Sequence, residues 1–409
     1  MTLYDELVWR GLIDNVTSPD LKEKINKGGL TFYIGTDPTG DSLHIGHFST
    51  FSMAFRLKKG GHHPILLVGG ATGLIGDPKP SAERPMITKE MLDHNYKHLR
   101  AQVEDIFGFE VVNNYDWTQH INCIDYLRDY GKYFNINYML SKETVKSRLD
   151  VGITYAEFSY MILQSLDFLH LFETKNCTLQ IGGSDQWGNI TPGVELIRKK
   201  TGKEVYGLTM PLITKADGTK FGKSEGNAIW LDKEKTSSYE MYQFFLNAED
   251  SKVIEYLKKL TFLSKEEIEV LEKSNLENPH LREAHKALAR EVITFLHGKE
   301  EYDKAVSVSE KLFSGNIQDL SLQDVMVGFK DVPHFTLETE LPLLEVLVQN
   351  GIASSKREAR EWIQNGAIAI NGDIIKDENK IIGKDIAMEG KVVVIRRGKK
   401  KYYLASFEA

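Results

Sequence analysis

The stretch YIGTDPTGDSLHIGH, residues 33–47, decides the fold of this 409-residue chain. It starts inside a β-rich run (28–35), turns at the DPTG tetrapeptide (37–40) and enters a helix near Leu43. Proline, glycine and aspartate are typical of turns, and an Asp-Ser pair directly before a helical pattern is typical of a helix cap. The stretch therefore predicts a strand followed directly by a helix, the repeating unit of α/β proteins.

The same alternation continues outward from this unit. An apolar strand (64–68) runs into a glycine-rich stretch (69–77), and helical patterns over 88–107 and 119–134 enclose a strand near 110–113. Strands that alternate repeatedly with helices predict a parallel sheet covered by helices.

A capping box and another strand extend the pattern. Thr154 and Glu157 predict the start of a long helix that runs to about residue 173. A strand (178–181), the loop GGSDQWG (182–188) and a further helix follow.

The C-terminal part of the chain has a different organisation. Residues 237–313 are purely helical in pattern, whereas residues 314–340 show no clear periodicity and are expected to form a linker. Residues 341–409 are expected to form a separate module, in which Asn371-Gly372 predicts a tight β-hairpin.

Composition excludes several classes of protein. Hydrophobic residues make up 41% of the chain and charged residues 27%, which is ordinary for a globular protein. No apolar run is long enough to span a membrane, and the N-terminus lacks the pattern of a signal peptide. The two cysteines, Cys123 and Cys177, are expected to be buried thiols in a reducing cytosol, so a cytoplasmic location is expected.

Charge is distributed unevenly along the chain. The formal net charge is −7, yet the segment from Leu343 onward carries 12 Lys and Arg against 9 Asp and Glu. A mildly basic module on an acidic body predicts contact with a polyanion. Within that module Lys356, Arg357 and Arg360 lie on one predicted helix and are candidate phosphate contacts.

Two histidines open the helix that follows the first turn. His44 and His47 are three residues apart, beside free backbone N–H groups and the positive end of the helix dipole. Gly46 leaves room for a nucleotide to approach the backbone, so the pattern predicts an anion site. A helix cap with two solvent-exposed histidines remains an alternative, and a zinc site lacks further ligands nearby.

A second basic motif, KFGKS (220–224), lies between Gly218 and Gly226. Its glycines predict a mobile loop, and two lysines three residues apart can reach one polyphosphate. The motif is not a P-loop, because no GxxxxGK[ST] pattern follows a strand. A solvated basic loop is the alternative.

Together, the HIGH tetrapeptide (44–47) and the downstream KFGKS loop resemble the signatures of the class I aminoacyl-tRNA synthetases. The stretches GGATGLIGDP, NNYDW, EFSYMILQ, LQIGGSDQWGNI and TKADGTKFGKS resemble the bacterial tyrosyl-tRNA synthetases, and SKREAREWIQNGAIAING resembles an S4-type RNA-binding domain. The resemblance covers essentially the whole chain. It implies an α/β fold with a Rossmann-like parallel-sheet catalytic domain (1–215), the KFGKS loop and connection (216–236), an α-helical domain (237–313), the linker (314–340) and a small α+β S4-like RNA-binding domain (341–409).

The resemblance implies a tyrosine–tRNA ligase. Such an enzyme joins tyrosine and ATP into tyrosyl-adenylate with release of pyrophosphate, and then passes tyrosine to the 3′-terminal ribose of tRNA(Tyr). The resemblance also implies a homodimer, and Mg²⁺ that is carried by the ATP phosphates without a protein-bound metal.

One predicted helix carries an unexpected polar stripe. Tyr160, Gln164 and Asp167 follow one another at i, i+4 and i+7 on a helix that is otherwise apolar. A solvated face is the usual explanation, but a buried stripe would need partners, and a ligand can supply them. The resemblance assigns seven residues to tyrosine: Tyr33 and Asp167 at its phenol, Asp77, Tyr160 and Gln164 at its ammonium group, Gln186 near its carboxylate, and Asn114 nearby.

The resemblance also divides the ATP site. It assigns the phosphates to Thr39, His44, Lys220, Lys223, Ser224 and the mobile-loop arginine Arg84. It assigns the rest of the nucleotide to Gly35, Asp37, Gly46, His47, Thr50, Gly183 and Asp185. Because the attacking carboxylate is already ionised, no general base is needed, and catalysis is expected to rest on positioning and charge stabilisation.

Three other interpretations remain open at this point. The most distant enzyme is a HxGH-type nucleotidyltransferase, for which the helical and RNA-binding domains would be superfluous. A tryptophan-specific relative shares the fold and both motifs, although Tyr33 with Asp167 favours a phenol. A noncatalytic RNA-binding protein on a synthetase scaffold is the third, although such a protein need not retain His44, His47 and Lys220.

Overall fold

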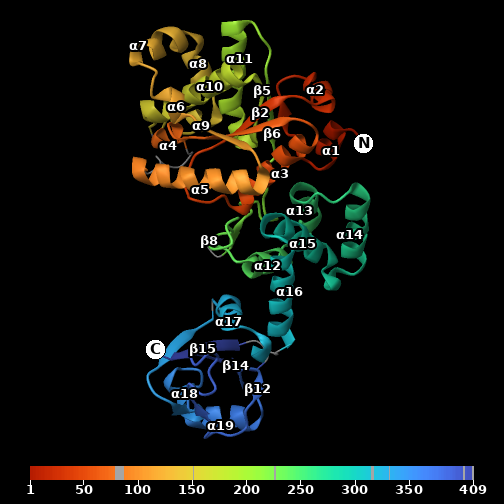
Figure 1. The fold of residues 1–409 in the computed structure, drawn as a ribbon, viewed down its shortest axis with the longest axis vertical. Helices are drawn as coiled ribbons and strands as arrows, with labels where there is room; N and C mark the ends of the chain where they lie inside the picture. Colours follow the sequence, from red (N-terminus) through yellow and green to blue (C-terminus); the bar gives the residue numbers. More distant parts are fainter. Residues whose placement is uncertain are drawn as a thin grey trace. The chain divides into compact units, whose positions relative to one another are not determined.

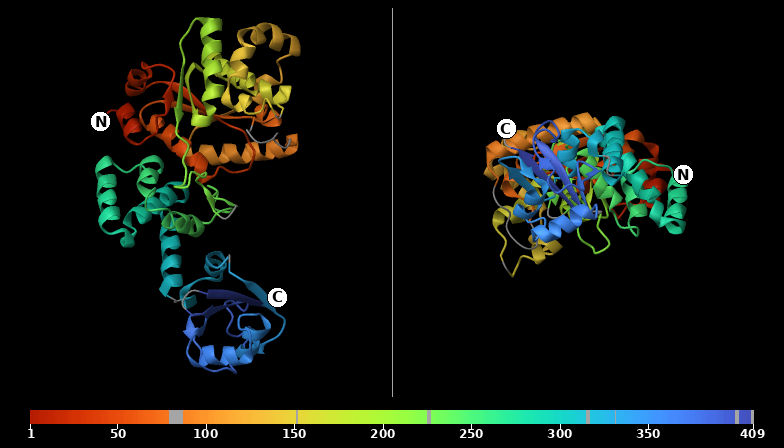
Figure 2. Two further views of the ribbon diagram at one scale, coloured as in Figure 1. Left: turned by 180° about the vertical axis from the view of Figure 1, so that it is seen from behind. Right: turned by 90° about the horizontal axis from the view of Figure 1, so that it is seen from below.

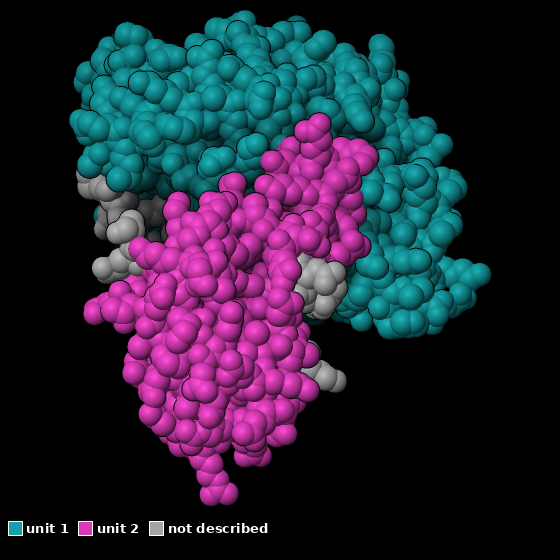
Figure 3. Space-filling model, turned by 60° about the horizontal axis from the view of Figure 1, so that its bottom comes forward, with its two compact units in different colours: residues 1–236, 245–296 teal, residues 237–244, 297–409 magenta. Residues whose placement is uncertain are grey.

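The computed structural model describes residues 1–78, 87–150, 152–224, 227–314, 317–330, 332–398 and 401–407. The chain forms two compact units, one of residues 1–236 and 245–296 and the other of residues 237–244 and 297–409 (Figure 1). Figure 3 colours the two units separately. The division falls inside helix α12 (Ser238–Leu246) and at the end of helix α15 (Glu283–His297), so the helical segment expected over 237–313 is shared between the units.

A six-stranded sheet forms the centre of the first unit, in the order β1-β6-β5-β2-β3-β4. Neighbours from β6 to β4 are parallel, and β1 is antiparallel to β6. The parallel strands are largely buried and apolar, as expected of a sheet with helices on both faces. The α/β architecture is thus confirmed, with two strands, β1 and β6, that the sequence pattern does not predict. The strands are β1 (Asn15–Val16), β2 (Thr31–Thr36), β3 (His63–Val68), β4 (Glu110–Asn113), β5 (Cys177–Gly183) and β6 (Tyr206–Met210).

The strand order reverses between β2 and β5. From β2 the chain builds outward through β3 and β4, and it then returns to the other side of β2 to add β5 and β6. In open α/β sheets, ligands bind outside the carboxyl ends of the strands at such a reversal. The loops that leave β2 and β5 here carry many of the predicted site residues.

Helices pack against this sheet (Figure 2). Helices α10 and α11 pack against each other and against β5, while α3 and α5 pack against β3. The predicted N-cap of α10 is present, since the side chain of Thr154 accepts a hydrogen bond from the Glu157 backbone N–H. The helices of the sheet region are α1 (Leu3–Trp9), α2 (Leu21–Lys27), α3 (Ile45–Lys59), α4 (Thr72–Ile75), α5 (Lys89–Phe107), α8 (Ile136–Leu140), α9 (Glu143–Lys146), α10 (Tyr155–Lys175) and α11 (Trp187–Thr201).

The helix expected over 119–134 is broken into short pieces, which follow α6 (Tyr115–Thr118). Asn122 caps a new turn by accepting a hydrogen bond from the Asp125 N–H, and such side-chain caps compete with a continuous helix. Cys123 is exposed here, contrary to expectation, whereas Cys177 is buried. The pieces are α7 (Cys123–Asp125), the π-helical turn η1 (Tyr126–Tyr130) and the 3₁₀ turn η2 (Gly131–Tyr133).

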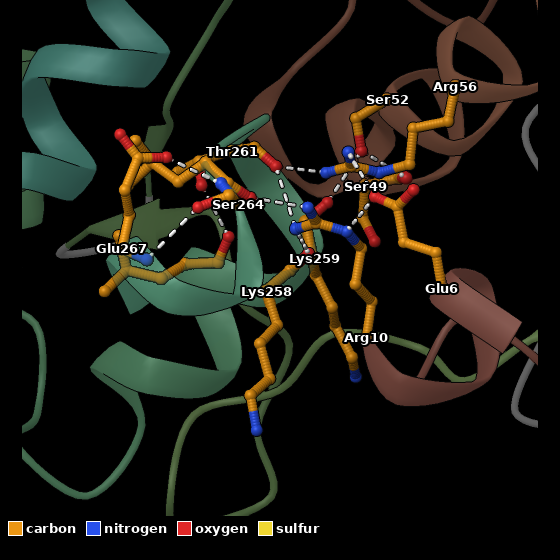
Figure 4. A network of polar contacts seen from close by, with 12 residues as sticks. Glu6, Arg10, Ser49, Ser52, Arg56, Lys258, Lys259, Thr261, Ser264 and Glu267 are labelled. Atoms are coloured by element: carbon orange, nitrogen blue, oxygen red, sulfur yellow. Dashed lines mark hydrogen bonds and ion pairs between the residues drawn. The ribbon is translucent and has the colours of Figure 1, made fainter. Parts of the chain in front are cut away.

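Two buried arginines connect α1, α3 and α13 (Val253–Leu260) (Figure 4). Arg10 and Arg56 both donate to the carbonyl oxygen of Thr261, directly after α13, and they share the carboxylate of Glu6. The last carbonyl groups of a helix have no partner within it, so the two guanidinium groups complete the end of α13. Helices α14 (Lys265–Glu277), η4 (Pro279–Leu281) and most of α15 complete this unit.

The second unit contains a five-stranded sheet in the order β12-β11-β14-β15-β9. One face, which includes Val393 and Ile395, packs against α18 (Leu343–Gln349) and α19 (Lys356–Gln364). The opposite face packs against α16 and α17 through Val392 and Val394. The remaining elements are α16 (Lys299–Ser314), α17 (Leu322–Gly328), β9 (His334–Leu337), β10 (Leu341–Pro342), β11 (Ile368–Ile370), β12 (Asp373–Ile374), β13 (Ile381–Ile382), β14 (Val392–Arg397) and β15 (Lys401–Phe407).

The segment expected to be a linker, 314–340, belongs to this unit. Its described residues form η5 (Ile317–Asp319), α17 and β9, and β9 pairs in parallel with β15. Val325 and Phe329 are buried in the core beneath the sheet. Three short elements share the segment, so it shows no single period in the sequence.

The hairpin predicted at Asn371-Gly372 is present between β11 and β12. Both residues have positive φ, 49° and 100°, which is the backbone that a tight two-residue hairpin turn requires. In the parts of the chain that the structure describes, no helix is both long and apolar enough to cross a bilayer.

Candidate active site

Side chains from three strand ends and one helix meet at the carboxyl edge of the first unit's sheet. Asp37 follows β2, Asn114 follows β4, and Gln186 follows β5 in the 3₁₀ turn η3 (Ser184–Gln186). Helix α10 is hydrogen-bonded to all three, through Tyr160 to Asp37 at 2.9 Å, Asp167 to Asn114 at 2.9 Å and Gln164 to Gln186 at 3.4 Å. The polar stripe on α10 therefore faces inward, and the solvated alternative is wrong.

Asp167 is the carboxylate at the buried end of this site, with 2% of its surface exposed. Its two oxygens accept hydrogen bonds from Asn114 Nδ2 and from Trp117 Nε1, both at 2.9 Å. Burial raises the pKa of Asp167 to about 7, although both hydrogen bonds oppose that shift. Trp117, which the sequence pattern does not single out, is a further member of the site.

The hydroxyl group of Tyr33 is buried without a hydrogen-bond partner among the described residues, and it lies within the electrostatic influence of this carboxylate. Burial and the charge of Asp167 raise the pKa of Tyr33 well above its usual value. A buried hydroxyl is stabilised by a partner, and a buried carboxylate can accept a further hydrogen bond. The pair of Tyr33 and Asp167 is thus suited to a ligand that presents a hydroxyl group.

A second polar cluster surrounds Asp77. Its two carboxylate oxygens accept hydrogen bonds from Gln186 Nε2 at 3.0 Å and from Asn189 Nδ2 at 3.1 Å. Asn189 also donates to Gln186 Oε1 at 3.2 Å, and Gln164 donates to the same oxygen. Acceptor oxygens of Asp77 and Gln186 are gathered here, which favours a ligand with N–H donors. Sequence reasoning missed Asn189, although it lies within the quoted stretch LQIGGSDQWGNI.

Asp37 lies between the two clusters and is held on both sides. Its Oδ1 accepts from Thr72 Oγ1 at 2.8 Å and its Oδ2 accepts from the Tyr160 hydroxyl at 2.9 Å. Gly69 makes this arrangement possible, because a Cβ atom there would lie 2.0 Å from Asp37 Oδ1 and 2.2 Å from Thr72 Oγ1. A side chain at Gly69 would displace the carboxylate.

The two histidines of the HIGH motif form the cap of α3. His44 Nδ1 accepts a hydrogen bond from the Gly46 N–H at 3.1 Å, and His47 Nδ1 accepts one from the His44 N–H at 3.3 Å. The imidazole rings stack with centroids 3.7 Å apart. Burial and the neighbouring His44 lower the pKa of His47 to about 3, so its ring is neutral near pH 7 and carries its proton on Nε2.

The KFGKS motif lies against the same end of α3. Phe221 is buried with its ring centroid 4.2 Å from that of Tyr256, and its carbonyl oxygen lies 3.2 Å from where a Cβ of Gly46 would be. Gly222 has a φ of +96°, and a Cβ there would lie 2.7 Å from Ile45 Cγ2. The loop backbone and the helix start are thus in direct contact.

The structure describes only some of the other residues that are predicted to contact the ATP phosphates. Lys220 is exposed and forms a β-bridge with Thr214. Lys223 and Ser224 form strand β7 (Lys223–Ser224), paired with β8 (Asn227–Ala228), but their side chains and the whole of Arg84 lie outside the described residues.

The positions assigned to the sugar and base lie at the strand ends and on α3. Gly35 is exposed at the end of β2, and a Cβ there would meet no atom within 4 Å. Gly183 ends β5, where a Cβ would lie 2.6 Å from Asp185 Oδ1. Thr39 is exposed after β2, and Thr50 is half-buried on α3 one turn after Gly46. The open backbone at Gly35 leaves room for a flat ligand, whereas Gly183 is required because Asp185 lies close to its backbone.

The candidate RNA-contacting residues lie on α19 in the second unit. Lys356 forms an ion pair with Glu345, and Arg360 Nε lies 2.7 Å from Glu378 Oε2. Arg357 is exposed, and no acidic side chain of the described residues pairs with it. Among the described residues, no group of three or more His, Cys, Asp or Glu side chains is arranged to hold a metal ion.

Comparison with known proteins identifies close relatives. A family model described as "tRNA synthetases class I (W and Y)" matches residues 25–314, and one described as "Tyrosine--tRNA ligase SYY-like C-terminal domain" matches residues 324–405. The chain is 52% identical to a tyrosine–tRNA ligase of Geobacillus stearothermophilus over 100% of both chains. It is also 52% identical to tyrosine–tRNA ligase 1 of Bacillus subtilis, over 99% of each chain.

A solved structure of a tyrosyl-tRNA synthetase is also similar to this chain. The C-terminally truncated mitochondrial tyrosyl-tRNA synthetase of Aspergillus nidulans is 32% identical and superimposes with a TM-score of 0.66. The match covers 76% of this chain and 94% of that one.

Proposed function

The chain belongs to the tyrosine–tRNA ligase family of the class I tRNA synthetases, and we propose how its residues divide the work of the reaction. The enzyme (EC 6.1.1.1) activates tyrosine with ATP to tyrosyl-adenylate and pyrophosphate, and then transfers tyrosine to the terminal ribose of tRNA. The tryptophan-specific and noncatalytic alternatives are not favoured by these relatives.

Tyr33 and Asp167 recognise the phenol of tyrosine in this proposal. The supporting observation is the unpartnered, buried Tyr33 hydroxyl next to a carboxylate that Asn114 and Trp117 hold from the other side. The phenol would donate to Asp167 and accept from Tyr33. Phenylalanine would leave both groups unpaired, and a site built around a hydroxyl group rejects such an analogue strongly, a discrimination for which this enzyme family is already a known example.

The ammonium and carboxylate groups of tyrosine are assigned to the cluster around Asp77. Asp77, Tyr160 and Gln164 present acceptor oxygens that suit three N–H donors. Gln186 lies within this cluster, close enough to Gln164 to turn its amide toward the substrate carboxylate. The carboxylate attacks the α-phosphorus of ATP and needs no base, because it is ionised near neutral pH.

The HIGH and KFGKS motifs are assigned to charge stabilisation. As charge moves onto the departing pyrophosphate, donors placed beforehand lower the barrier. The neutral Nε2–H groups of His44 and His47 provide such donors at the start of α3, where the helix dipole is also favourable. The residues proposed for the phosphates are Thr39, His44, Lys220, Lys223, Ser224 and Arg84.

The nucleoside is assigned to the open strand ends. Asp185 would accept from a ribose hydroxyl, and the exposed backbone of Gly35 and the half-buried backbone of Gly183 would lie against the ring systems. The other residues proposed to contact the nucleotide are Asp37, Gly46, His47 and Thr50. ATP enters with Mg²⁺ on its phosphates, since Mg²⁺ is usually bound through substrate phosphates and few protein ligands.

A homodimer is the proposed assembly, and the described residues 124–150 and 152–155 are its proposed interface. Large apolar side chains in this segment are unusually exposed, which is typical of a surface that another protein covers. The buried ion pair of Arg148 and Glu157, with two N–O distances of 3.1 and 3.2 Å, ties the segment to α10. The exposed residues are Ile124, Leu127, Ile136, Tyr138, Leu149 and Tyr155.

Sedimentation equilibrium of Leu127→Lys tests the assembly. The variant is expected to be monomeric, whereas Val270→Lys, at an even more exposed apolar residue on α14, is expected to stay dimeric. A dimer that survives Leu127→Lys would contradict the proposed interface. The reducing cytoplasm is the proposed compartment, because the two cysteines are unpaired.

Tyrosine-dependent exchange of pyrophosphate into ATP, without tRNA, tests the assignment of the phenol site. Exchange is expected with tyrosine and not with phenylalanine or tryptophan. Exchange with phenylalanine at a comparable rate would contradict the role of Tyr33 and Asp167, and exchange with tryptophan would overturn the phenol site itself.

A further inference from the structure

We propose that Trp230 is a positioning residue that holds the imidazole of His44 for the ATP step. The inference rests on the role proposed above for His44. The observations that carry it are separate: a backbone bridge, two ring contacts and an ion pair around Trp230.

The backbone sets these two residues opposite each other. His44 and Trp230 form an isolated antiparallel β-bridge between the start of α3 and the segment after the KFGKS motif. Directly opposite side chains in an antiparallel pair lie on the same face, so the two rings are brought together. The bridge is flanked by two hydrogen bonds of 2.8 Å, from the Ile45 N–H to the Ile229 carbonyl and from the Leu231 N–H to the Leu43 carbonyl.

The ring contacts restrict how the His44 imidazole can turn. Trp230 meets it edge-on, with ring centroids 6.2 Å apart at 62°, and His47 stacks on it with centroids 3.7 Å apart. His44 Nδ1 is occupied by the Gly46 N–H, which leaves the proton on Nε2. A ring that is held by three neighbours presents this Nε2–H in one direction, as electrostatic catalysis requires.

Trp230 is itself fixed by the turn that precedes α3. Lys235 Nζ lies 5.7 Å from the centroid of the Trp230 ring and 2.8 Å from Asp41 Oδ1. A Cβ at Gly40 would lie 3.6 Å from Trp230 Cη2, so the indole lies close to this turn. The backbone N–H of Trp230 donates to Thr236 Oγ1 at 3.0 Å, which fixes the main chain that carries the ring. The Lys235 ammonium group and the turn limit the movement of the indole, while the backbone bond fixes the position from which it meets His44.

Steady-state pyrophosphate exchange with Trp230→Ala and Trp230→Phe tests the inference. Trp230→Ala is expected to lower kcat about two- to tenfold, the usual range for an aromatic pair. The KM for tyrosine and the rate of tyrosine transfer from preformed adenylate are expected to stay unchanged. Trp230→Phe keeps a ring edge and is expected to restore most of kcat. The matched control is Trp9→Ala, a half-exposed tryptophan of the same unit, over whose ring the cations of Arg10 and Lys258 lie.

A double-mutant cycle separates positioning from a general structural effect. His44→Asn keeps a side chain that can cap α3 but removes the ring that Trp230 contacts. If Trp230 acts through His44, Trp230→Ala causes no further loss in the His44→Asn background. An equal fold-loss of exchange from Trp230→Ala in the parent enzyme and in the His44→Asn background would overturn the inference. Unchanged exchange in His44→Asn alone would instead overturn the proposed role of His44, and the inference with it.

Discussion

Asn114 Nδ2 lies 2.9 Å from Oδ2 of Asp167, so a side chain at the end of β4 holds the carboxylate that α10 presents to the substrate. Asn114 is itself fixed, because its Oδ1 accepts a hydrogen bond from the Ala71 N–H at 2.7 Å. Its amide group and Trp117 favour the charged form of Asp167, while burial favours the neutral form. The charge state of the phenol site is therefore set by these neighbours.

Replacing Asn114 with alanine is expected to raise the pKa of Asp167 above about 7. The ionised carboxylate accepts a hydrogen bond from the phenol of tyrosine, so kcat/KM for tyrosine rises with pH through the pKa of Asp167. In Asn114→Ala this rise should move to higher pH. Near pH 7 the loss is expected to be about 10- to 100-fold, the usual worth of a hydrogen bond to a charged group. The pH profile of pyrophosphate exchange measures both effects.

Ser165→Ala is the matched control for this change. Ser165 is also buried and polar on α10, but its hydroxyl donates to the Met161 carbonyl of its own helix. Its pH profile should follow that of the parent enzyme. The same profile in Asn114→Ala would contradict the role given to Asn114.

The free energy of unfolding should change with pH in the direction opposite to kcat/KM. The folded pKa of Asp167 is about 7, above the ordinary value of 3.8, so the folded protein holds a proton that the unfolded chain has lost between these values. The free energy of unfolding therefore falls as pH rises across this range, by at most about 1.4 kcal/mol per pH unit.

Asp167→Asn removes this contribution. The free energy of unfolding of each protein is measured by urea unfolding between about pH 4 and about pH 8. The value for the variant should increase relative to that of the parent as pH rises. Curves that stay parallel would mean that Asp167 is already ionised at acid pH.

Much of the fold follows from sequence pattern. The strand–turn–helix unit around residues 31–59, the cap at Thr154 and the Asn371-Gly372 hairpin are local, because each depends on residues a few positions apart. The segment 314–340 and strand β6 are not local in this sense. Their residues are buried by partners far along the chain, such as β15 for β9, and no period in the segment reveals those partners.

The site divides in the same way. The HIGH and KFGKS motifs are contiguous and could be located from the sequence, and so could the polar stripe on α10. Asn189, Trp117 and Trp230 become visible only where the fold brings them to Asp77, Asp167 and His44. The expected Asp41-Ser42 cap is wrong, because His44 is the N-cap and forms a reciprocal cap with His47. Histidine is not among the preferred N-cap residues, so capping preferences point to Asp41-Ser42 instead.

Arg357 is expected to contribute more to tRNA binding than either basic neighbour on α19. Lys356 and Arg360 are paired with Glu345 and Glu378, which offsets their charge, whereas Arg357 has no acidic partner among the described residues. Arg357→Gln should weaken tRNA binding and lower the slope of log K against log salt by about one unit. Filter binding of tRNA over a salt series measures this slope.

Arg360→Gln is the control for that experiment, and tyrosine-dependent pyrophosphate exchange should be normal in both variants. An equal change of slope in the two variants would indicate that the ion pair with Glu378 opens on RNA and that α19 acts as a uniform basic face. A loss of exchange in Arg357→Gln would place the residue outside a purely RNA-binding role.

Arg56 is expected to stabilise the first unit by completing the end of α13. Its guanidinium group is buried, donates to the Thr261 carbonyl and lies over the Phe262 ring at 4.5 Å. Arg56→Met keeps much of the apolar volume but leaves a buried carbonyl group with one donor fewer, which should lower the free energy of unfolding by about 1–3 kcal/mol. Arg100→Met removes an exposed ion pair with Glu104 on α5 and should cost less than about 1 kcal/mol. Urea unfolding of both variants measures these two losses. Equal losses of the free energy of unfolding would mean that the buried arginine stabilises the protein no more than a surface arginine does. This happens where the cost of desolvating a buried charge cancels its hydrogen bonds.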